Sequence, residues 1–302
     1  MQDILIRAGS FVAIIVLGYV LRRIHFFKEG DFHILSKIVI KITLPAAIVT
    51  SFVGKEIDPS MFTLGLIGLG GGLAYMAIAY LLNRRSGKEQ QAFEILNTSG
   101  YNIGNFTMPF VQSFLGPVGV IATSLFDTGN AFICLGGSYS VAAIVKENSG
   151  FSVKRIVKAL VKSVAFDCYI IMSIMSIAKI PVPSVVASFA EIIANGNAFM
   201  AMLMIGVGFK LSGDKKQVKD IIRILSVRYS VAALLALGCF FLLPFGLEVR
   251  QALVILVFSP IASAAPAFTE ELKGDVGLSS AVNSISIVCS IVFIVGILLV
   301  ML

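Results

Sequence analysis

Residues 91–115 have the sequence QAFEILNTSGYNIGNFTMPFVQSFL, and residues 250–268 have the sequence RQALVILVFSPIASAAPAF. Both stretches are largely apolar, but polar, glycine and proline residues break each of them near the middle. The interrupting residues are Asn102, Gly104, Asn105, Thr107 and Pro109 in the first stretch, and Ser259, Pro260, Ser263 and Pro266 in the second. Interrupted spans at corresponding places in the two halves of a chain are typical of the binding site of a secondary transporter. Unwound backbone is tolerated at membrane depth only where protein buries it or where it lines a cavity, so the two breaks predict such a site.

The composition is that of a polytopic membrane protein. Of the 302 residues, 57% are hydrophobic and 14% are charged, and the mean hydropathy is +0.94, whereas a soluble domain averages about 25% charged residues. The net charge of +7 does not indicate a nucleic-acid partner, because the basic residues lie in short connectors rather than in a tail. The four cysteines fall inside apolar stretches, without the spacing of metal ligands or of a disulfide framework. We therefore expect a protein embedded in a lipid bilayer, without a cofactor or a resident metal.

Apolar segments of about 20 residues predict ten membrane-spanning helices, at residues 3–21, 34–53, 61–82, 91–115, 118–145, 156–178, 184–209, 219–243, 249–269 and 277–301. Every second connector is rich in basic residues: Arg22, Arg23, Lys28, Arg84, Arg85, Lys88, Lys146, Lys154, Arg155, Lys158, Lys210, Lys215, Lys216, Lys219, Arg223 and Lys273. The other connectors hold only Lys55, Lys179 and Arg250. An excess of Lys and Arg marks the cytoplasmic side. We therefore expect a multi-pass protein of the plasma (inner) membrane with both termini outside the cytoplasm.

The polar connector 146–158 divides the chain into two sets of five spans, residues 1–150 and residues 151–302. A set with an odd number of spans starts and ends on opposite sides of the membrane, so two successive sets have opposite orientations. The expected fold is therefore all-α, with ten transmembrane helices in two inverted five-helix repeats. The fourth and ninth helices, broken near 102–109 and 259–266, are expected to cross.

The two breaks carry groups that suit an anionic ligand. Proline removes a helical hydrogen bond, and a broken helix exposes an N-terminus whose free N–H groups and partial positive charge attract anions. Asparagine amides supply donors and acceptors without a fixed charge, and a serine hydroxyl can donate. We therefore expect a small organic anion to bind among Asn102, Gly104, Asn105, Pro109, Ser263 and Pro266. The alternative is that the breaks are kinks that only help the helices to pack, since Gly and Pro are common in membrane helices.

The stretch Asn102-Ile103-Gly104-Asn105-Phe106-Thr107-Met108-Pro109 resembles the fourth-span signature of the auxin efflux carrier family, in which an Asn and a Gly precede a Pro seven residues after the Asn. The resemblance extends to Leu44-Pro45-Ala46, Ile205-Gly206-Val207-Gly208, Ala264-Ala265-Pro266-Ala267 and the small residues from Asp275 to Ser290. The chain departs from the family pattern at Thr107, where a second Gly is usual, and in having Pro260 and the pair Glu270-Glu271.

The resemblance implies ten helices in two inverted repeats, with the broken fourth and ninth helices crossing at the site. It also implies a scaffold bundle that supports a moving transport bundle. Members of that family carry small organic anions, such as auxin in plants and malate or malonate in bacteria. By position, Asn102, Pro109 and Pro266 match the crossover residues of the family.

Charges inside membrane spans are costly and are usually functional. Asp127 and Asn130 are three residues apart and share one helix face. We expect that face to point at the crossover and Asp127 to bind a coupling proton or sodium ion. The alternative is a carboxylate that only ties this span to a neighbouring helix. For Asp167 we favour a structural pairing with Lys162 or Arg228.

Other functional classes fit the sequence less well. The protease motifs His-Glu-x-x-His and Gly-x-Gly-Asp are absent, and both histidines, His25 and His33, lie near the first basic connector, so we expect no enzyme. A channel would need rings of polar or charged pore residues, whereas symmetric broken helices fit alternating access better. A sodium- or proton-coupled carrier of the bile-acid or sodium/proton exchanger type is the alternative, although more acidic residues would be expected at its crossover. A homodimer is also left open.

Overall fold

The computed structural model describes residues 2–28, 30–55, 57–147, 150–209 and 217–302. Over these residues the secondary structure is helical, and the one β-type contact is an isolated antiparallel bridge between Tyr101 and Ile261. The predicted all-α class is confirmed. Three of the basic connector residues, Lys210, Lys215 and Lys216, lie outside the described residues.

The helices follow one another as α1 (Gln2–Arg23), α2 (Asp31–Ile38), η1 (Val39–Thr43), α3 (Leu44–Phe52), η2 (Pro59–Thr63), α4 (Leu64–Leu82), α5 (Lys88–Thr98), η3 (Ile103–Thr107), α6 (Met108–Phe114), α7 (Gly116–Phe132), η4 (Ile133–Gly137), α8 (Ser138–Glu147), α9 (Val153–Leu160), α10 (Val164–Ile177), α11 (Ser184–Ala194), α12 (Asn197–Gly208), α13 (Val218–Phe241), α14 (Leu247–Val257), α15 (Ala265–Glu271) and α16 (Val276–Met301).

Seven helical stretches in the described part of the chain are long and apolar enough to cross a membrane, or eight if α9 and α10, bent by 75°, form one span. The two remaining predicted spans, 91–115 and 249–269, are each divided between two short helices, α5 with α6 and α14 with α15. Large apolar side chains on the outside, such as Leu66 (71% exposed) and Val185 (80%), suit a lipid surround.

Prolines account for the form of two spans. The π-helices η1 and η3 each end two residues before a proline, Pro45 or Pro109. A proline cannot donate to the carbonyl four residues earlier, and its ring clashes with that carbonyl, so the preceding turn widens into a π-bulge. A third π-helix, η4, contains Gly136 at φ +148 and kinks the fifth predicted span, which was not expected from the sequence.

The breaks lie slightly before the predicted ones. Residues 99–102 are non-helical between α5 and η3, and residues 258–264 are non-helical between α14 and α15. Gly100 has φ +76, a conformation that ends a helix at little cost for glycine. Pro109 and Pro266 lie outside the breaks, in the first turns of α6 and α15, where the fixed φ of proline favours the helix. The proposal that Pro109 itself breaks the span is therefore corrected.

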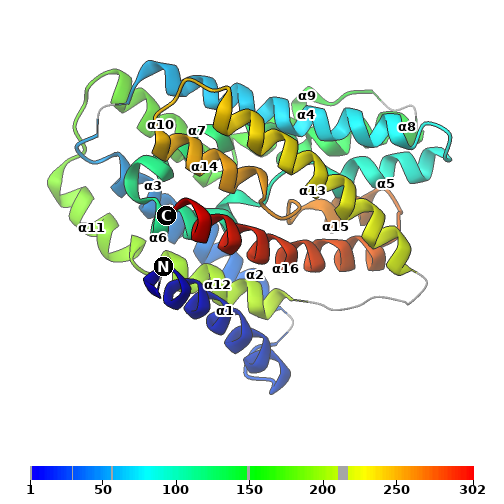
Figure 1. Ribbon diagram of the computed structural model, residues 1–302, viewed down its shortest axis with the longest axis horizontal. Helices are drawn as coiled ribbons and strands as arrows, with labels where there is room; N and C mark the ends of the chain where they lie inside the picture. Colours follow the sequence, from blue (N-terminus) through cyan, green and yellow to red (C-terminus); the bar gives the residue numbers. More distant parts are fainter. Residues whose placement is uncertain (1, 29, 56, 148–149, 210–216) are drawn as a thin grey trace.

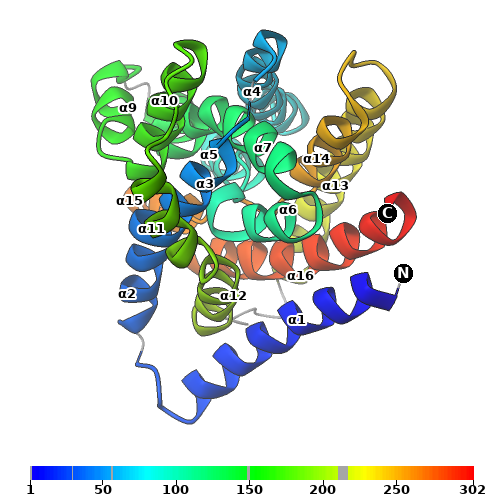
Figure 2. The ribbon, with the colours of Figure 1, turned by 90° about the vertical axis from the view of Figure 1, so that its left-hand side faces the viewer.

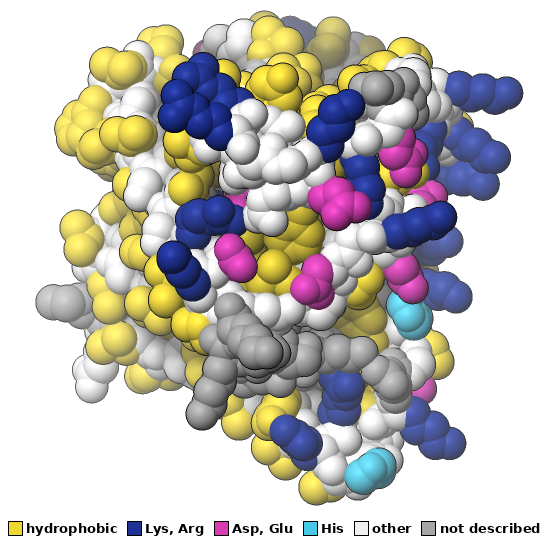
Figure 3. Space-filling view, turned by 90° about the vertical axis from the view of Figure 1, so that its right-hand side faces the viewer, with side chains coloured by type: hydrophobic (Ala, Val, Ile, Leu, Met, Phe, Trp, Pro, Cys, Tyr) yellow, Lys and Arg dark blue, Asp and Glu magenta, His cyan; other side chains and the backbone are white. Residues whose placement is uncertain are grey.

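Figure 1 shows most helices running along the long axis, with both termini toward one end and the connections α4–α5, α8–α9 and α15–α16 at the other. Figure 3 looks onto this second end, where Lys, Arg, Asp and Glu side chains gather while hydrophobic side chains cover the flank. The charged end and the terminal end thus lie at opposite ends of the long axis.

α1 and α12 approach each other closely because glycine faces glycine. A Cβ on Gly18 would lie 2.5 Å from the Leu203 carbonyl oxygen, and a Cβ on Gly206 would lie 2.0 Å from that of Ile15. Small residues that let backbones meet are a common basis of helix association in lipid. Figure 2 shows α1, α2 and α12 together on one side of the molecule, with α4, α7, α13 and α14 on the other.

Candidate functional site

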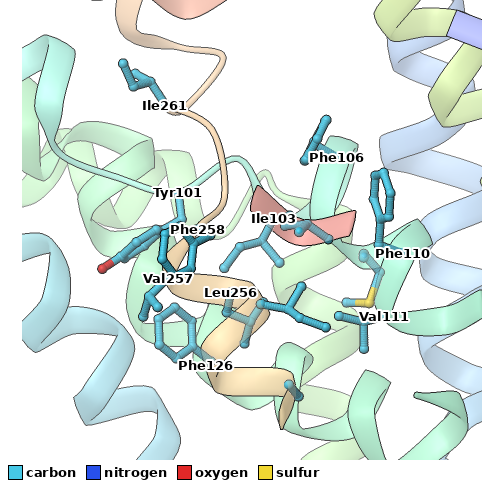
Figure 4. Packing of buried hydrophobic residues seen from close by; sticks show 14 of the residues in the cluster. Tyr101, Ile103, Phe106, Phe110, Val111, Phe126, Leu256, Val257, Phe258 and Ile261 are labelled. Atoms are coloured by element: carbon cyan, nitrogen blue, oxygen red, sulfur yellow. The ribbon is translucent and has the colours of Figure 1, made fainter. Parts of the chain in front are cut away.

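The two breaks meet at the centre of the molecule. The Asn102 N–H donates to the Pro260 carbonyl over 2.9 Å, and Tyr101 pairs with Ile261 in the antiparallel bridge. Thr107 and Ser259 share a hydroxyl–hydroxyl hydrogen bond of 2.6 Å. The crossing is embedded in one hydrophobic cluster, to which both broken helices and Phe126 of α7 contribute (Figure 4). Backbone groups freed by one break are therefore partly satisfied by the other.

Arg228 of α13 joins the two breaks from one side. Its guanidinium donates to the carbonyls of Thr98 and Gly100 in the first broken helix, the second at 3.0 Å, and to those of Ser259 (2.8 Å) and Pro260 (3.0 Å) in the second. The last carbonyls of a helix lack partners in the helix and carry partial negative charge. A fully buried guanidinium with several fixed donors binds the last carbonyl of α5 and carbonyls in the unwound segments of both breaks.

The role of Arg228 differs from the one expected. It was considered as a partner of Asp167, but its hydrogen-bond partners are backbone carbonyls, and within the described residues Asp167 forms no ion pair. Two aromatic rings also face the guanidinium, Tyr75 at 5.1 Å and Tyr101 at 5.4 Å from ring centre to Cζ. The sequence did contain a signal for this role: an arginine in the middle of an apolar span is energetically costly and is therefore usually functional.

An asparagine from the following span holds each break. In the first, Asn130 of α7 accepts from the Tyr101 N–H (3.0 Å) and donates to the Tyr101 carbonyl (2.9 Å). In the second, Asn283 of α16 donates to the carbonyls of Ile261 (3.2 Å) and Ala262 (3.1 Å). Asn130 was predicted to face the crossover and does so; Asn283 was not singled out from the sequence.

Serines of α16 complete the support of the second break. The Ile261 N–H donates to the Ser286 hydroxyl over 3.2 Å, and the Ser290 hydroxyl donates to the Phe258 carbonyl over 2.6 Å. These partners satisfy several groups of the unwound backbone, as is required at membrane depth where water is absent.

A cavity of about 160 Å³ lies on the other side of the crossing from Arg228. Its walls come from both breaks, from α7, from the start of α10 and from η1–α3. Of the predicted site residues, the cavity is lined by Asn102, Gly104, Asn105, Ser263, Asp127 and Asn130, and not by Pro109 or Pro266. At Gly104 a Cβ would come within 2.8 Å of Leu44, so a larger residue would press on the opposite wall.

The polar groups of the cavity are partly free. The Asn105 amide donates to the Ser263 hydroxyl over 3.4 Å, while its oxygen, although buried, has no partner within the described chain. Asp127 accepts from the Asn130 amide (2.7 Å) and from the Tyr169 hydroxyl of α10 (2.9 Å). Among the described lining residues Asp127 is the one charged side chain, and none is Lys, Arg or His.

A larger cavity, about 720 Å³, lies further along α10 at its C-terminal end. It is lined by Phe52, Met172, Lys55 and Lys179, and the two lysines are among the three basic residues of the connectors that hold few charges. Helix α10 thus borders both cavities, with Tyr169 at the smaller and Met172 one turn further on at the larger.

Comparison with known proteins bears on the class of this chain. A family model described as a membrane transport protein matches residues 10–162, just over half of the chain. The chain is also similar to an uncharacterized transporter of Methanothermobacter thermautotrophicus, with 23% identity over 287 residues that cover 94% of this chain and 93% of that protein.

Proposed function

Because the chain belongs to the membrane transport protein family, that of the auxin efflux carriers, we propose that it is a secondary transporter that moves a small organic anion, such as a carboxylate, across the plasma membrane. The observation that carries the proposal is the meeting of two unwound segments beside a cavity that is lined in part by polar side chains. A cavity needs only about 10–15 Å³ to hold one water, so 160 Å³ leaves room for a small ligand.

The proposed architecture is ten spans in two inverted repeats of five. α5–α6 and α14–α15 are then the broken fourth and ninth spans. Two features support equivalence of the halves: the breaks pair in antiparallel fashion, and each is held by an asparagine of the next span, Asn130 or Asn283.

The crossing has two chemically different sides. On one side Arg228 binds carbonyls at the end of α5 and just beyond the ends of α5 and α14. The cavity lies on the other side, where Asn102 precedes η3 and α6 and therefore lies at the positive end of that helix. The Asn102 side chain has no partner in the described chain, so its amide is available to a carboxylate oxygen. Ser263 supplies a hydroxyl from the second break.

Alternating access requires the crossing to move against the wall formed by α10 and η1–α3. Few hydrogen bonds join the crossing and α7 to this wall and its neighbours α9 and α12, and each of them can be broken and formed again. They include Tyr169 to Asp127, Asn197 of α12 to Gln112 of α6 at 3.1 Å, and the ion pair of Arg155 (α9) with Glu271 (α15) at 2.5 Å. Such contacts can exchange between two states without unfolding either group of helices.

Asp127 is the proposed coupling residue, binding a proton or a sodium ion together with the substrate. This assignment leaves room for the alternative, a cation-coupled carrier of the bile-acid or sodium/proton exchanger type on the same kind of crossing. A single acidic side chain at the cavity favours an anion carrier, because exchangers of cations alone would be expected to place several there.

The test is uptake by purified protein in liposomes, with a panel of radiolabelled mono- and dicarboxylates and counterflow to separate a carrier from a channel. Asn102→Ala should reduce uptake at least tenfold, since it removes a ligand-facing amide worth about 1.5–3 kcal/mol in a charged hydrogen bond. The unfolding temperature should stay near that of the unchanged protein, because Asn102 binds the rest of the site through its backbone.

Asn195→Ala is the matched control, since Asn195 is exposed at the end of α11, away from the cavity. Equal uptake by the Asn102→Ala and Asn195→Ala proteins would refute the site, and a panel without a transported carboxylate would refute the substrate class.

A further inference from the structure

We infer that the substrate carboxylate is carried together with one proton, held between it and the Asp127 carboxylate, so that the coupling ion is a proton and not sodium. The inference rests on the proposed function and names its coupling chemistry. It follows from the charges that line the cavity and from the groups that already contact Asp127.

The cavity carries no positive side chain to offset an anion. Asp127 is its one charged lining residue in the described chain, and Arg228, which does not line the cavity, has its N–H groups directed at backbone carbonyls. An ionised Asp127 would therefore repel a carboxylate in the same small cavity. Two carboxyl groups that share a site do not both ionise; one of them keeps a proton.

The oxygens of Asp127 and Asn130 already accept hydrogen bonds. Each Asp127 oxygen faces a donor, the Asn130 amide or the Tyr169 hydroxyl. The Asn130 oxygen, the next acceptor along, already receives the Tyr101 N–H and the Cys134 thiol. Hard cations are bound by several oxygens at once, so sodium at Asp127 would have to displace these donors. A proton, in contrast, needs only one of the two carboxylate oxygens.

Proton binding converts Asp127 from a repelling group into a donor. A proton from the bulk adds to one carboxylate oxygen, and the resulting O–H can then donate to an oxygen of the substrate carboxylate. Release reverses the step on the other side, where the anion leaves and the proton returns to water. A monocarboxylate is thus carried as a neutral pair, and a dicarboxylate with one remaining negative charge.

The groups that face Asp127 do not compete for this proton. They are Tyr169 from α10 and Cys134 from η4, both neutral weak acids near neutral pH. The wall from η1–α3 contributes Ile40 and Leu44, which do not titrate. On the α4 side the neighbours of α7 are the glycines Gly65 and Gly68. Proton-linked binding should therefore be traceable to Asp127.

The test uses the full-length protein with malonate as the probe. Malonate binding is measured by titration calorimetry in weak buffer, with a pH indicator that counts protons taken up. We expect uptake of one proton per malonate, and an affinity that falls about tenfold per pH unit above the titration of Asp127, as one linked proton requires. Asp127→Asn should bind without proton uptake and without this pH dependence, whereas the control Asp167→Asn should behave like the unchanged protein.

A ligand-free measurement decides the coupling ion separately. On acidification, infrared difference spectra of the folded protein should show a carboxylic-acid band that is missing in Asp127→Asn, and Tyr169→Phe should move its titration to higher pH. Sodium chloride should stabilise the protein no more than choline chloride does. Stabilisation specific to sodium and lost in Asp127→Asn would overturn the inference alone, as would malonate binding without proton uptake. Protonation of Asp127 in a protein that binds no carboxylate of the panel would overturn both the inference and the proposed function.

Discussion

At the residue scale, Arg228 shows how one side chain can stabilise a helix crossing. A buried positive charge is usually balanced by a carboxylate, but here four backbone carbonyls from two broken helices take that place. The guanidinium can do this because it presents five N–H donors in a fixed plane. The arrangement leaves the opposite side of the crossing, with Asn102 and Asp127, free for a ligand.

Replacing Arg228 by methionine should destabilise the protein strongly. The variant keeps a long apolar side chain but removes every donor, and each buried carbonyl left unpaired costs about 1–3 kcal/mol. Arg228→Lys should retain part of the stability, because an ammonium group has three donors. Thermal unfolding in detergent, followed by a thiol-reactive dye on the buried Cys239 and the three partly buried cysteines, measures the effect.

Arg250→Met is the control for this experiment. Arg250 is half-buried, donates to the Phe240 carbonyl over 3.0 Å and makes no contact with the breaks. Its loss should lower the unfolding temperature much less. Equal shifts for the two variants would show that the carbonyl contacts of Arg228 do not stabilise the crossing.

At the element scale, the breaks in the helices and the π-bulges have different causes. The breaks at 99–102 and 258–264 are places where the chain unwinds and is held by Asn130 and Asn283. The bulges η1 and η3 come from the prolines that follow them. In η3 the bulge helps to set which way Asn105 points, since one extra residue in a turn rotates what precedes it by about 100°.

Pro109→Ala should therefore alter the site without closing the break. The new N–H could bond the Asn105 carbonyl and convert η3 into an α-helical turn, which would move Asn105 out of the cavity. We expect uptake to fall severalfold while the unfolding temperature changes little. Pro117→Ala is the control, because Pro117 lies in the first turn of α7 with no π-helix before it. Unchanged uptake by Pro109→Ala would mean that the bulge does not orient the site.

At the scale of the whole molecule, charge is distributed along the long axis. The end shown in Figure 3 carries a dense set of Lys, Arg, Asp and Glu side chains. At the other end, the 720 Å³ cavity is lined by Lys55 and Lys179. If basic connectors face the cytoplasm, this larger cavity opens to the outside and offers two amines to an approaching anion, which raises its local concentration.

The orientation can be tested with the native lysines. Treating intact cells with a membrane-impermeant amine reagent should label Lys55 and Lys179, both exposed, and leave the equally exposed Lys154 and Lys158 unlabelled until the cells are opened. Peptide mass spectrometry measures each site. Labelling of Lys154 or Lys158 in intact cells would reverse the expected orientation of the termini.

Local properties of the sequence were enough to predict the helical membrane class and the two breaks, together with most of the polar residues that line the cavity. Hydropathy and helix-breaking act within a few residues, because every backbone group in lipid must find a partner nearby. The positions of Asn102, Asn105, Ser263 and Asp127 could therefore be predicted from motif and span. These residues line one cavity only because the two breaks meet in the folded protein.

What tertiary structure alone decided is which distant groups satisfy the unwound backbone. Arg228 donates to the carbonyl of Gly100, 128 residues away in the sequence. Asn283 donates to the Ile261 carbonyl in the second break, and no sequence pattern links these two residues. Neither partner is encoded in spacing, since a carbonyl accepts from whichever donor the packing brings to it. For the same reason Pro109 and Pro266, which were expected to line the site, lie beside it. The effect of each proline on its own helix could be predicted, but the direction of the helix that follows depends on the helices packed around it.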